Sequence, residues 1–350
     1  MVDADQNNPA RGWFARVREF KEGKRVKARW FLLVITLMLV GGTAAPTGAQ
    51  VRLLSLVTGG TAGVYFPLGG AMAEIWNARV PGVRVASQSS GASVANIQFI
   101  ARGDAHLALV QNDVAYYAHN GREMFAEAGS NQPKPVAGVR GIAMLYPETI
   151  QIVTVRGRRI AAVEDLRGKR VVVGAAGSGT EANARQILSV HDIYYREMRV
   201  DFLSFAAGID QLRDGNVDAV FITAGVPTAA VTDVASSREV VILPVSNDAL
   251  DALRARWPFY TRQIIVPDTY RGQSAPVPTV AVMAMLVARA DLPEDLVYNL
   301  TKALWENLDR MKAAHARGRD LELTKALDGM PLPVHPGAER YYRERGVRGR

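Results

Sequence analysis

The chain has 350 residues, 48% of them hydrophobic and 22% charged, which is enough material for two cores of ordinary size. Its net charge is +8, but residues 1–49 hold eight Lys or Arg and four Asp or Glu, so the rest carries only about +4, and its scattered basic residues do not indicate nucleic-acid binding. The absence of cysteine excludes disulfides, thiolate metal sites and a lipid attached through cysteine.

The first 49 residues have the pattern of a secretory leader. Basic residues lie between Arg11 and Arg29, the apolar run FLLVITLMLV follows at 31–40, and the small-residue stretch GGTAAPTGAQ comes next. This order is typical of a signal peptide, with Ala49 as the expected last residue before the cut, and it predicts an exported, periplasmic protein. The alternative is an uncleaved membrane anchor, but the apolar run falls short of the roughly 20 residues that cross a bilayer.

The same order of elements occurs twice in the rest of the chain. Residues 52–77 have the pattern of a buried strand, a glycine-rich turn and an amphipathic helix, and the segment VRVASQSSGASVANIQFIARGDAHLALV adds a strand, a loop, a helix and a strand. Residues 170–188 and the segment MRVDFLSFAAGIDQLRDGNVDAVFI repeat this order. Two βαβαβ units predict an α/β protein of two lobes, with a cleft beyond the carboxyl ends of the strands where ligands bind.

Strand-like segments connect the two predicted lobes in both directions. The segments IAMLY and IQIVTV carry the chain from lobe I to lobe II, and the run VAVMAMLVA returns it before a long helix that begins near Pro293. We expect lobe I at residues 50–149, lobe II at 150–278, and a return strand with C-terminal helices packed on lobe I at 279–350. Such a double crossover forms a hinge that permits closure around a ligand.

The sequence contains no recognisable catalytic or metal-binding set. The five histidines lack the spacing of metal ligands, no G-x-S-x-G motif is present, and no acid, base and nucleophile can be grouped. We therefore predict a protein that is not an enzyme and that uses no metal or cofactor. The alternative is a dinucleotide enzyme, because Gly177 to Ala182 match G-x-G-x-x-A after a strand, but Asp201 falls too early in its strand to bind a ribose.

Small polar loops that follow the strands form the candidate ligand site. Glycine turns at 58–65 and 177–180 lie between a strand and a helix, where free backbone N–H groups and the helix dipole can hold an anion. Further polar residues precede the second helix of lobe I and follow its third strand. The candidates are Thr58, Gly59, Gly63, Tyr65, Ser90, Ser93, Asn96, Gln111, Asp113, Ser178, Gly179 and Thr180. The alternative is that the glycines only form turns and the hydroxyls only cap helices.

Seven segments resemble the TAXI family of solute-binding proteins, the extracytoplasmic receptors of one branch of tripartite ATP-independent periplasmic (TRAP) transporters. They are TGGTAGVYFPLGGAMA, SSGASVANI, LALVQNDVA, LRGKRVVVGAAGSGTEANA, DGNVDAVFITAGVPTAAV, TVAVMAMLV and PLPVHPGAERYYRERG, and they occur in family order across almost the whole chain after the leader. The resemblance implies a two-lobed periplasmic-binding-protein fold of type II-like topology. It also adds Gly225 and Pro227 to the expected ligand contacts.

The resemblance further implies a function. The protein would bind a small carboxylate or amino acid, such as glutamate, glutamine or 2-oxoglutarate, and deliver it to a sodium-driven TRAP membrane subunit. We expect a monomer that contacts the membrane only through the transporter or an uncleaved leader. The carboxylate-clamping arginine of the other major TRAP receptor family has no counterpart here, so neutral donors would hold the carboxylate. Tyr65 would pack on the ligand's carbon skeleton or, alternatively, in the core. The alternative function is an exported sensor or hydrolase with the same fold.

Overall fold

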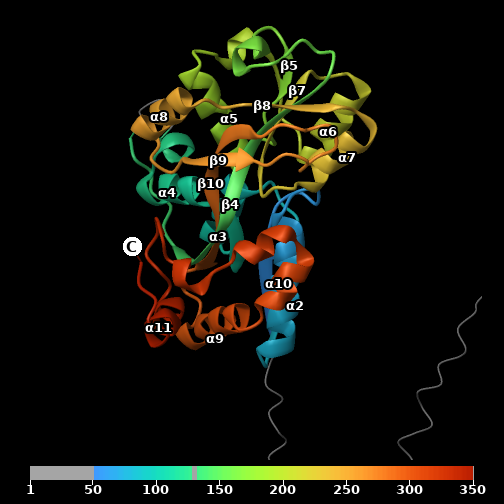
Figure 1. Cartoon of the computed structure of the whole chain (residues 1–350). Coiled ribbons are helices and arrows are strands. Elements are labelled where there is room, and N and C mark those ends of the chain that lie inside the picture. The colour runs from blue at the N-terminus through green and yellow to red at the C-terminus, as the bar shows by residue number, and fades with distance from the viewer. Residues whose placement is uncertain (1–50, 128–131, 350) are drawn as a thin grey trace, which may run out of the picture. The chain divides into compact units, whose positions relative to one another are not determined.

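The computed structural model describes residues 51–127 and 132–349, and the predicted leader lies outside these residues (Figure 1). The described strands form one ten-stranded sheet in the order β2-β1-β3-β10-β4-β7-β5-β6, with β8 paired to β4 and β9 paired to β10. None of the helices in the described part of the chain combines the length and hydropathy that a membrane span requires.

Lobe I contains a parallel three-stranded unit in the order β2-β1-β3. Strands β1 and β3 are short apolar runs, whereas β2, VRVASQ, alternates apolar and polar residues at the edge of the sheet. Helices α3 and α4 end at Gly103 and Gly121, which have the left-handed conformation that glycine adopts without strain. The elements are β1 (Arg52–Val57), α2 (Tyr65–Arg79), β2 (Val83–Gln88), α3 (Ser93–Arg102), β3 (Leu107–Gln111), α4 (Asn112–Asn120) and the 3₁₀ helix η2 (Glu123–Phe125).

Lobe II repeats this arrangement with the parallel order β6-β5-β7, so in both lobes the first strand lies between the second and the third. Three of its helices begin at serine caps, Ser178, Ser204 and Ser246, each accepting a hydrogen bond from the N–H three residues on. The elements are η3 (Val163–Leu166), β5 (Arg170–Val172), α5 (Gly179–Val190), η4 (Tyr195–Glu197), β6 (Arg199–Asp201), α6 (Phe205–Asp214), β7 (Ala219–Ala224), α7 (Ala229–Ser237), β8 (Val240–Leu243) and α8 (Asn247–Arg256). The duplication predicted from the sequence is confirmed.

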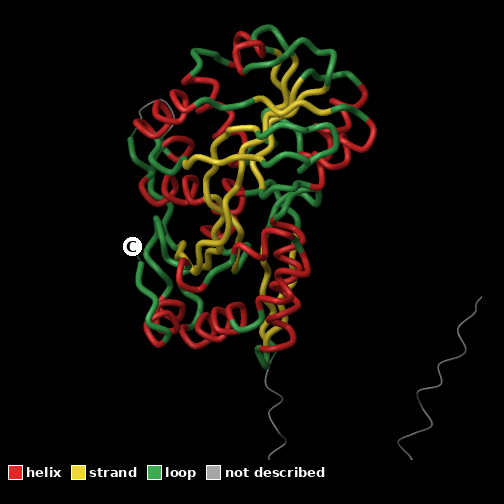
Figure 2. Tube along the Cα trace, in the orientation of Figure 1, coloured by secondary structure: helices red, strands yellow, loops and turns green. Residues whose placement is uncertain are grey.

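Two long antiparallel strands connect the lobes, β4 (Val139–Val155) and β10 (Val277–Arg289), and they run through the centre of the strand trace in Figure 2. Strand β10 pairs with β3 of lobe I and β4 pairs with β7 of lobe II, while the short strand β9 (Thr261–Ile265) pairs antiparallel with the first part of β10. The segments IAMLY and IQIVTV are parts of one strand, β4. The expected boundary at residue 149 falls inside that strand, and the division into domains stays a prediction.

Two of the C-terminal helices, α9 and α10, lie beside α2 in Figure 1, and α11 packs on α9. Their anchor is Trp76 of α2, which is fully buried and whose indole N–H donates to the carbonyl oxygen of Leu300 at 2.9 Å. The expectation of one long helix from Pro293 is wrong, because the chain leaves the helical conformation at Asn307 (φ −133°, ψ 38°), whose side chain donates to the Ala303 carbonyl oxygen instead. The elements are α9 (Glu294–Trp305), α10 (Leu308–Ala314), η5 (Ala316–Asp320), η6 (Leu323–Lys325) and α11 (Pro336–Glu344).

Candidate ligand-binding site

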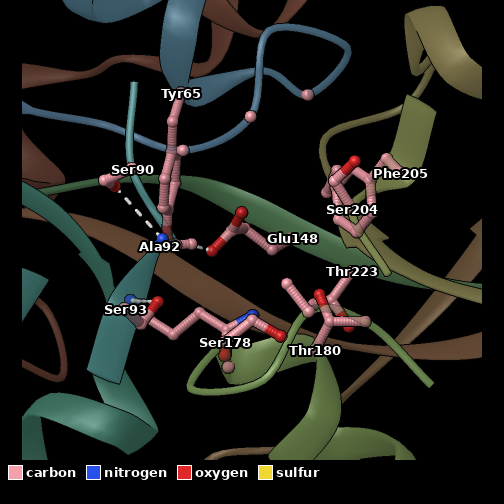
Figure 3. A pocket seen from close by; sticks show the side chains of 18 of the residues that line it. Tyr65, Ser90, Ala92, Ser93, Glu148, Ser178, Thr180, Ser204, Phe205 and Thr223 are labelled. Carbon is pink, nitrogen blue, oxygen red and sulfur yellow. Dashed lines mark hydrogen bonds between the residues drawn. The ribbon is translucent and has the colours of Figure 1, made fainter. Parts of the chain in front are cut away.

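A cavity lies where the carboxyl ends of the parallel strands of the two lobes meet (Figure 3). Its empty volume, which includes solvent at the open mouth, is about 580 Å³. Both lobes contribute to the wall. The residues predicted from the sequence that line the cavity are Gly59, Gly63, Tyr65, Ser90, Ser93, Gln111, Ser178, Gly179 and Thr180.

Thr58 and Asn96 lie behind the cavity wall and join the ends of three strands. The Thr58 hydroxyl donates to the carbonyl oxygen of Gln88 at 2.8 Å. The Asn96 amide donates to the carbonyl oxygens of Thr58 and Leu109 at 2.6 and 2.8 Å, and it accepts a hydrogen bond from the Ser90 hydroxyl at 2.6 Å. These bonds hold the ends of β1, β2 and β3 together, so both side chains support the glycine turn from outside the cavity.

Asp113, Gly225 and Pro227 are also outside the cavity lining. Asp113 is fully buried, and its Oδ2 accepts a hydrogen bond from the Asn183 amide at 2.9 Å, between α4 and α5. Gly225 is buried against the side chain of Arg317, and Pro227, which follows a cis peptide bond, is exposed. A role in ligand contact stays a prediction for all three.

Glu148 belongs to the cavity wall, although the sequence analysis did not select it. This residue of β4 is 3% exposed, and its Oε2 accepts a hydrogen bond from the Tyr65 hydroxyl at 2.5 Å (Figure 3). Tyr65 is 6% exposed and also lines the cavity, so it is a core residue and a wall residue at once. The available signal was a lone acidic residue within the largely apolar segment LYPETIQIV, since charged side chains are seldom buried without a partner.

The environment of Glu148 favours its protonated form. Burial raises the pKa of Glu148 to about 8, with a further rise from the nearby charge of Asp113, while the hydrogen bond from Tyr65 opposes the rise. Burial likewise raises the pKa of Asp113 to about 6. The cavity lining contains no Lys, Arg or His, so none of its side chains offers Glu148 a cationic partner. A cation placed beside Glu148 would therefore lower its pKa and favour ionisation.

The N-terminus of α5 lies at the cavity and is suited to an anion. Ser178 caps the helix, since its Oγ accepts a hydrogen bond from the Glu181 N–H at 3.2 Å. The first turn of a helix leaves other N–H groups without intrahelical partners, and the helix dipole favours negative charge there. The Gln111 side chain of lobe I packs so closely on Gly179 that an added Cβ would collide with its amide group. This contact joins the two lobes at the cavity.

Two buried oxygen atoms of the wall are without a hydrogen-bond partner among the described residues, Gln111 Oε1 and Thr223 Oγ1. Buried polar atoms are nearly always hydrogen-bonded in folded proteins. A ligand with N–H or O–H groups could supply these bonds. Within residues 51–127 and 132–349 no group of three or more His, Cys, Asp or Glu side chains is arranged to hold a metal ion.

Comparison with known proteins identifies the family. Residues 56–346 match the model of the NMT1-like family, and the chain belongs to that family. The chain is similar in structure to PhnD1 from Prochlorococcus marinus, solved with methylphosphonate, with a TM-score of 0.53 and 12% identity over 85% of this chain and 99% of that one. The NMT1-like family is thus shown for this chain. The TAXI assignment, which rests on the seven sequence segments, remains a prediction.

Two further solved structures have lower similarity. The periplasmic aliphatic sulphonate binding protein SsuA from Escherichia coli has a TM-score of 0.44 and 14% identity over 77% of this chain and 80% of that one. A putative L-cystine ABC transporter protein from Listeria monocytogenes has a TM-score of 0.47 and 14% identity over 78% and 98% of the two chains. The predicted α/β fold with two lobes is confirmed, because two parallel strand units are joined by two long strands and the chain shares its fold with PhnD1.

Proposed function

We propose that this protein is an extracytoplasmic solute receptor that binds a small amino acid between its lobes. The observation that carries this proposal is Glu148, a buried carboxylic acid in a cavity whose lining contains no basic side chain. A ligand ammonium group would give the ionised Glu148 the cationic partner that the wall lacks, because opposite charges in a buried site favour the charged form of each.

The ligand carboxylate is proposed to bind at the N-terminus of α5, near Ser178, Gly179 and Thr180. Backbone N–H groups, hydroxyls and the helix dipole can hold an anion there without a basic side chain. The Tyr65 hydroxyl orients Glu148 on the other side of the cavity (Figure 3). The remaining proposed contacts are Gly59, Gly63, Ser90, Ser93 and Gln111, which line the same cavity.

Charge selects among the ligands that the TAXI resemblance implies. L-Glutamate and L-glutamine carry an ammonium group, whereas 2-oxoglutarate would place two carboxylates near Glu148 in a cavity without a basic side chain. Methylphosphonate, with which PhnD1 was solved, likewise carries only negative charge. Like charges at close range in a buried site are costly. We therefore expect the amino acids to bind more tightly than either anion.

Closure of the lobes around the ligand is part of the proposal. The proposed lobes are residues 50–149 and 150–278, with 279–350 returning to lobe I. Two backbone hydrogen bonds of 3.3 Å cross between them, from the Ala95 N–H to the carbonyl oxygen of Gly177 and from the Ala230 N–H to that of Ala62. A ligand that contacts both lobes favours the closed state, because those contacts exist together only when the lobes meet.

The proposed location is the periplasm, and the proposed partner is the membrane subunit of a transporter. The sequence resemblance favours a sodium-driven TRAP subunit, and an ATP-driven ABC transporter is the alternative. Uptake of L-glutamate by intact cells that depends on this protein should stop when the sodium gradient is collapsed at constant ATP. Uptake that persists without the gradient and stops with ATP depletion would contradict the TRAP partner.

The ligand class can be tested by thermal shift and calorimetric titration of residues 51–350. L-Glutamate or L-glutamine should raise the melting temperature with increasing concentration, and NMR should find the amino acid unchanged after incubation. Glu148→Gln, which keeps the shape of the side chain, should weaken binding by roughly ten- to a hundredfold. Glu239→Gln, at an exposed site, is the control. Tighter binding of 2-oxoglutarate or methylphosphonate would contradict the amino-acid ligand, and consumption of the ligand would indicate an enzyme.

A further inference from the structure

A second hollow, the outer groove, adjoins the ligand cavity. Its empty volume is about 570 Å³, and it shares Gly60, Ser90, Ser204 and Phe205 with the cavity. The residues that line the outer groove alone are Thr61, Ala62, Ser89 and Ala206. The outer groove therefore has no ionisable side chain in its lining, unlike the cavity with Glu148.

Phe205 is the one large side chain among the four shared residues. It is the first residue of α6 in lobe II, and its ring lies beside Ser204 at the edge of the site in Figure 3. Gly63 of lobe I lies against this ring, since an added Cβ there would be 3.4 Å from Cε2 and 3.5 Å from Cδ2. The ring thus lies at the boundary between the cavity and the outer groove, and it meets the opposite lobe at a residue without a side chain.

The start of α6 is held in place by its own cap. The Ser204 Oγ accepts a hydrogen bond from the Ala207 N–H at 3.4 Å, which fixes the turn that carries Phe205. Gly208, in the next turn, packs on Val172 and Val220 of the sheet, where an added Cβ would lie within 3.0 and 3.2 Å of their side chains. The Phe205 ring therefore belongs to a helix that packs closely on the sheet.

We propose that Phe205 sets the length of the solute that the closed protein accepts. This inference rests on the proposed function, since it takes the cavity as the ligand site. The polar groups of Glu148, Gln111 and Thr223 belong to the cavity and not to the outer groove. A solute that is anchored to them and extends toward the outer groove must pass the Phe205 ring. A longer solute collides with the ring, and a smaller residue at this position joins cavity and outer groove into one elongated site.

The first test needs no ligand. The chain has no cysteine, so Thr223→Cys places a single thiol in the cavity wall. Phe205→Ala should raise the rate at which this thiol reacts with the bulky reagent fluorescein-5-maleimide, while the rate with the small reagent methyl methanethiosulfonate changes little. Phe202→Ala removes a ring of equal size that is 48% exposed and lines neither hollow, so it should change neither rate. Equal fluorescein-5-maleimide rates with and without the Phe205 ring would overturn the proposal.

The second test measures selectivity by calorimetric titration with L-glutamate, L-2-aminoadipate and L-2-aminopimelate, which lengthen by one methylene each. Phe205→Ala should improve the affinity for L-2-aminopimelate relative to L-glutamate by about tenfold or more, and Phe205→Leu by less. An unchanged ratio in a variant that labels faster would show that Phe205 does not set solute length. If none of the three acids binds the wild type or Phe205→Ala, the proposed amino-acid ligand is wrong. The labelling rates then test by themselves whether Phe205 separates the cavity from the outer groove.

Discussion

Asp113 of α4 and Asn183 of α5 form a fully buried hydrogen bond of 2.9 Å between the two lobes. The bond belongs to a chain, because Asn183 also donates to the Tyr260 hydroxyl at 3.0 Å, Tyr260 donates to Gln186 Oε1 at 2.6 Å, and the Gln186 amide donates to the Tyr117 hydroxyl at 3.2 Å. Helices α4 and α5 thus meet through polar groups rather than through a continuous apolar face. Such a contact can be hydrated when the lobes separate, so it suits an interface that opens.

Asn183→Ala should therefore weaken ligand binding, although Asn183 does not line the cavity. Removing the amide leaves Asp113 buried with one partner fewer, which disfavours the closed state, and a smaller closed fraction lowers the apparent affinity in proportion. We expect roughly a ten- to hundredfold weaker affinity for L-glutamate by calorimetry. Asn216→Ala removes an exposed hydrogen bond within lobe II and is the control. If Asn183→Ala binds L-glutamate as tightly as the control, the contact between α4 and α5 does not contribute to closure.

Binding of an ammonium-bearing ligand should release a proton from Glu148. The pKa of Glu148 in the free protein is raised to about 8, so below that pH the ligand must displace a proton to pair with the carboxylate. The affinity for L-glutamate should then rise by up to about tenfold per pH unit as the pH approaches 8 and level off above it. Titrations in buffers of different ionisation enthalpy measure the proton directly. Glu148→Gln should abolish the release, and an affinity that falls with rising pH would mean that protonated Glu148 donates to the ligand.

Ionisation of Glu148 should lower the stability of the free protein as the pH rises. Glu148 has an ordinary pKa of 4.5 when unfolded and about 8 when folded, so between these values the folded state binds more protons. The free energy of unfolding therefore falls across that window, and Asp113 contributes in the same direction between 3.8 and about 6. Urea unfolding from pH 4 to pH 9 measures the slope. Glu148→Gln should make the free energy of unfolding nearly independent of pH above pH 6. If the variant has the same slope as the wild type, groups other than Glu148 cause the pH dependence.

Substitutions of Ser178 and Thr180 should distinguish a role in helix capping from a role in ligand binding. Ser178 is the cap of α5, so Ser178→Ala should cost about 1 kcal/mol of folding stability, seen as a lower urea midpoint. Thr180 lines the cavity and is not the cap, so Thr180→Val, which keeps its shape, should lower the affinity for L-glutamate by about tenfold with a smaller change in midpoint. Calorimetry and urea unfolding of both variants test this contrast. If Thr180→Val lowers the urea midpoint and leaves the affinity unchanged, Thr180 supports the fold and does not bind the ligand.

Much of the fold could be predicted because its signals are local. Short apolar runs, glycine turns and amphipathic segments identified both βαβαβ units, and their repetition identified two lobes. The exceptions depend on distant contacts. The segments around Pro147 read as two strands, yet they form one, because β4 pairs with β10 and then β8 along one side and with β7 along the other. The break at Asn307 depends on one side chain competing for a backbone carbonyl, which a helical pattern does not reveal.

The candidate site was predictable as a set of loops but not as a set of side chains. Gln111 is the last residue of β3 and Asp113 lies two residues further on, yet Gln111 lines the cavity and Asp113 faces α5, because α4 begins between them. Glu148 was missed for a different reason. Its place in the wall comes from its pairing with Tyr65, which is 83 residues away in sequence. Only the assembled sheet brings these two side chains together.

Gly179→Ala should keep the lobes apart. An added Cβ at Gly179 would collide with the Gln111 amide of lobe I, while the backbone of Gly179 is not in the left-handed region and accepts alanine in its own lobe. We expect a loss of affinity for L-glutamate by calorimetry and, by small-angle scattering, no decrease in radius of gyration at a ligand concentration that closes the wild type. Gly70→Ala, which adds its Cβ to open space on α2, is the control and should leave binding unchanged. Normal binding and compaction in Gly179→Ala would show that the Gln111 contact is not required for closure.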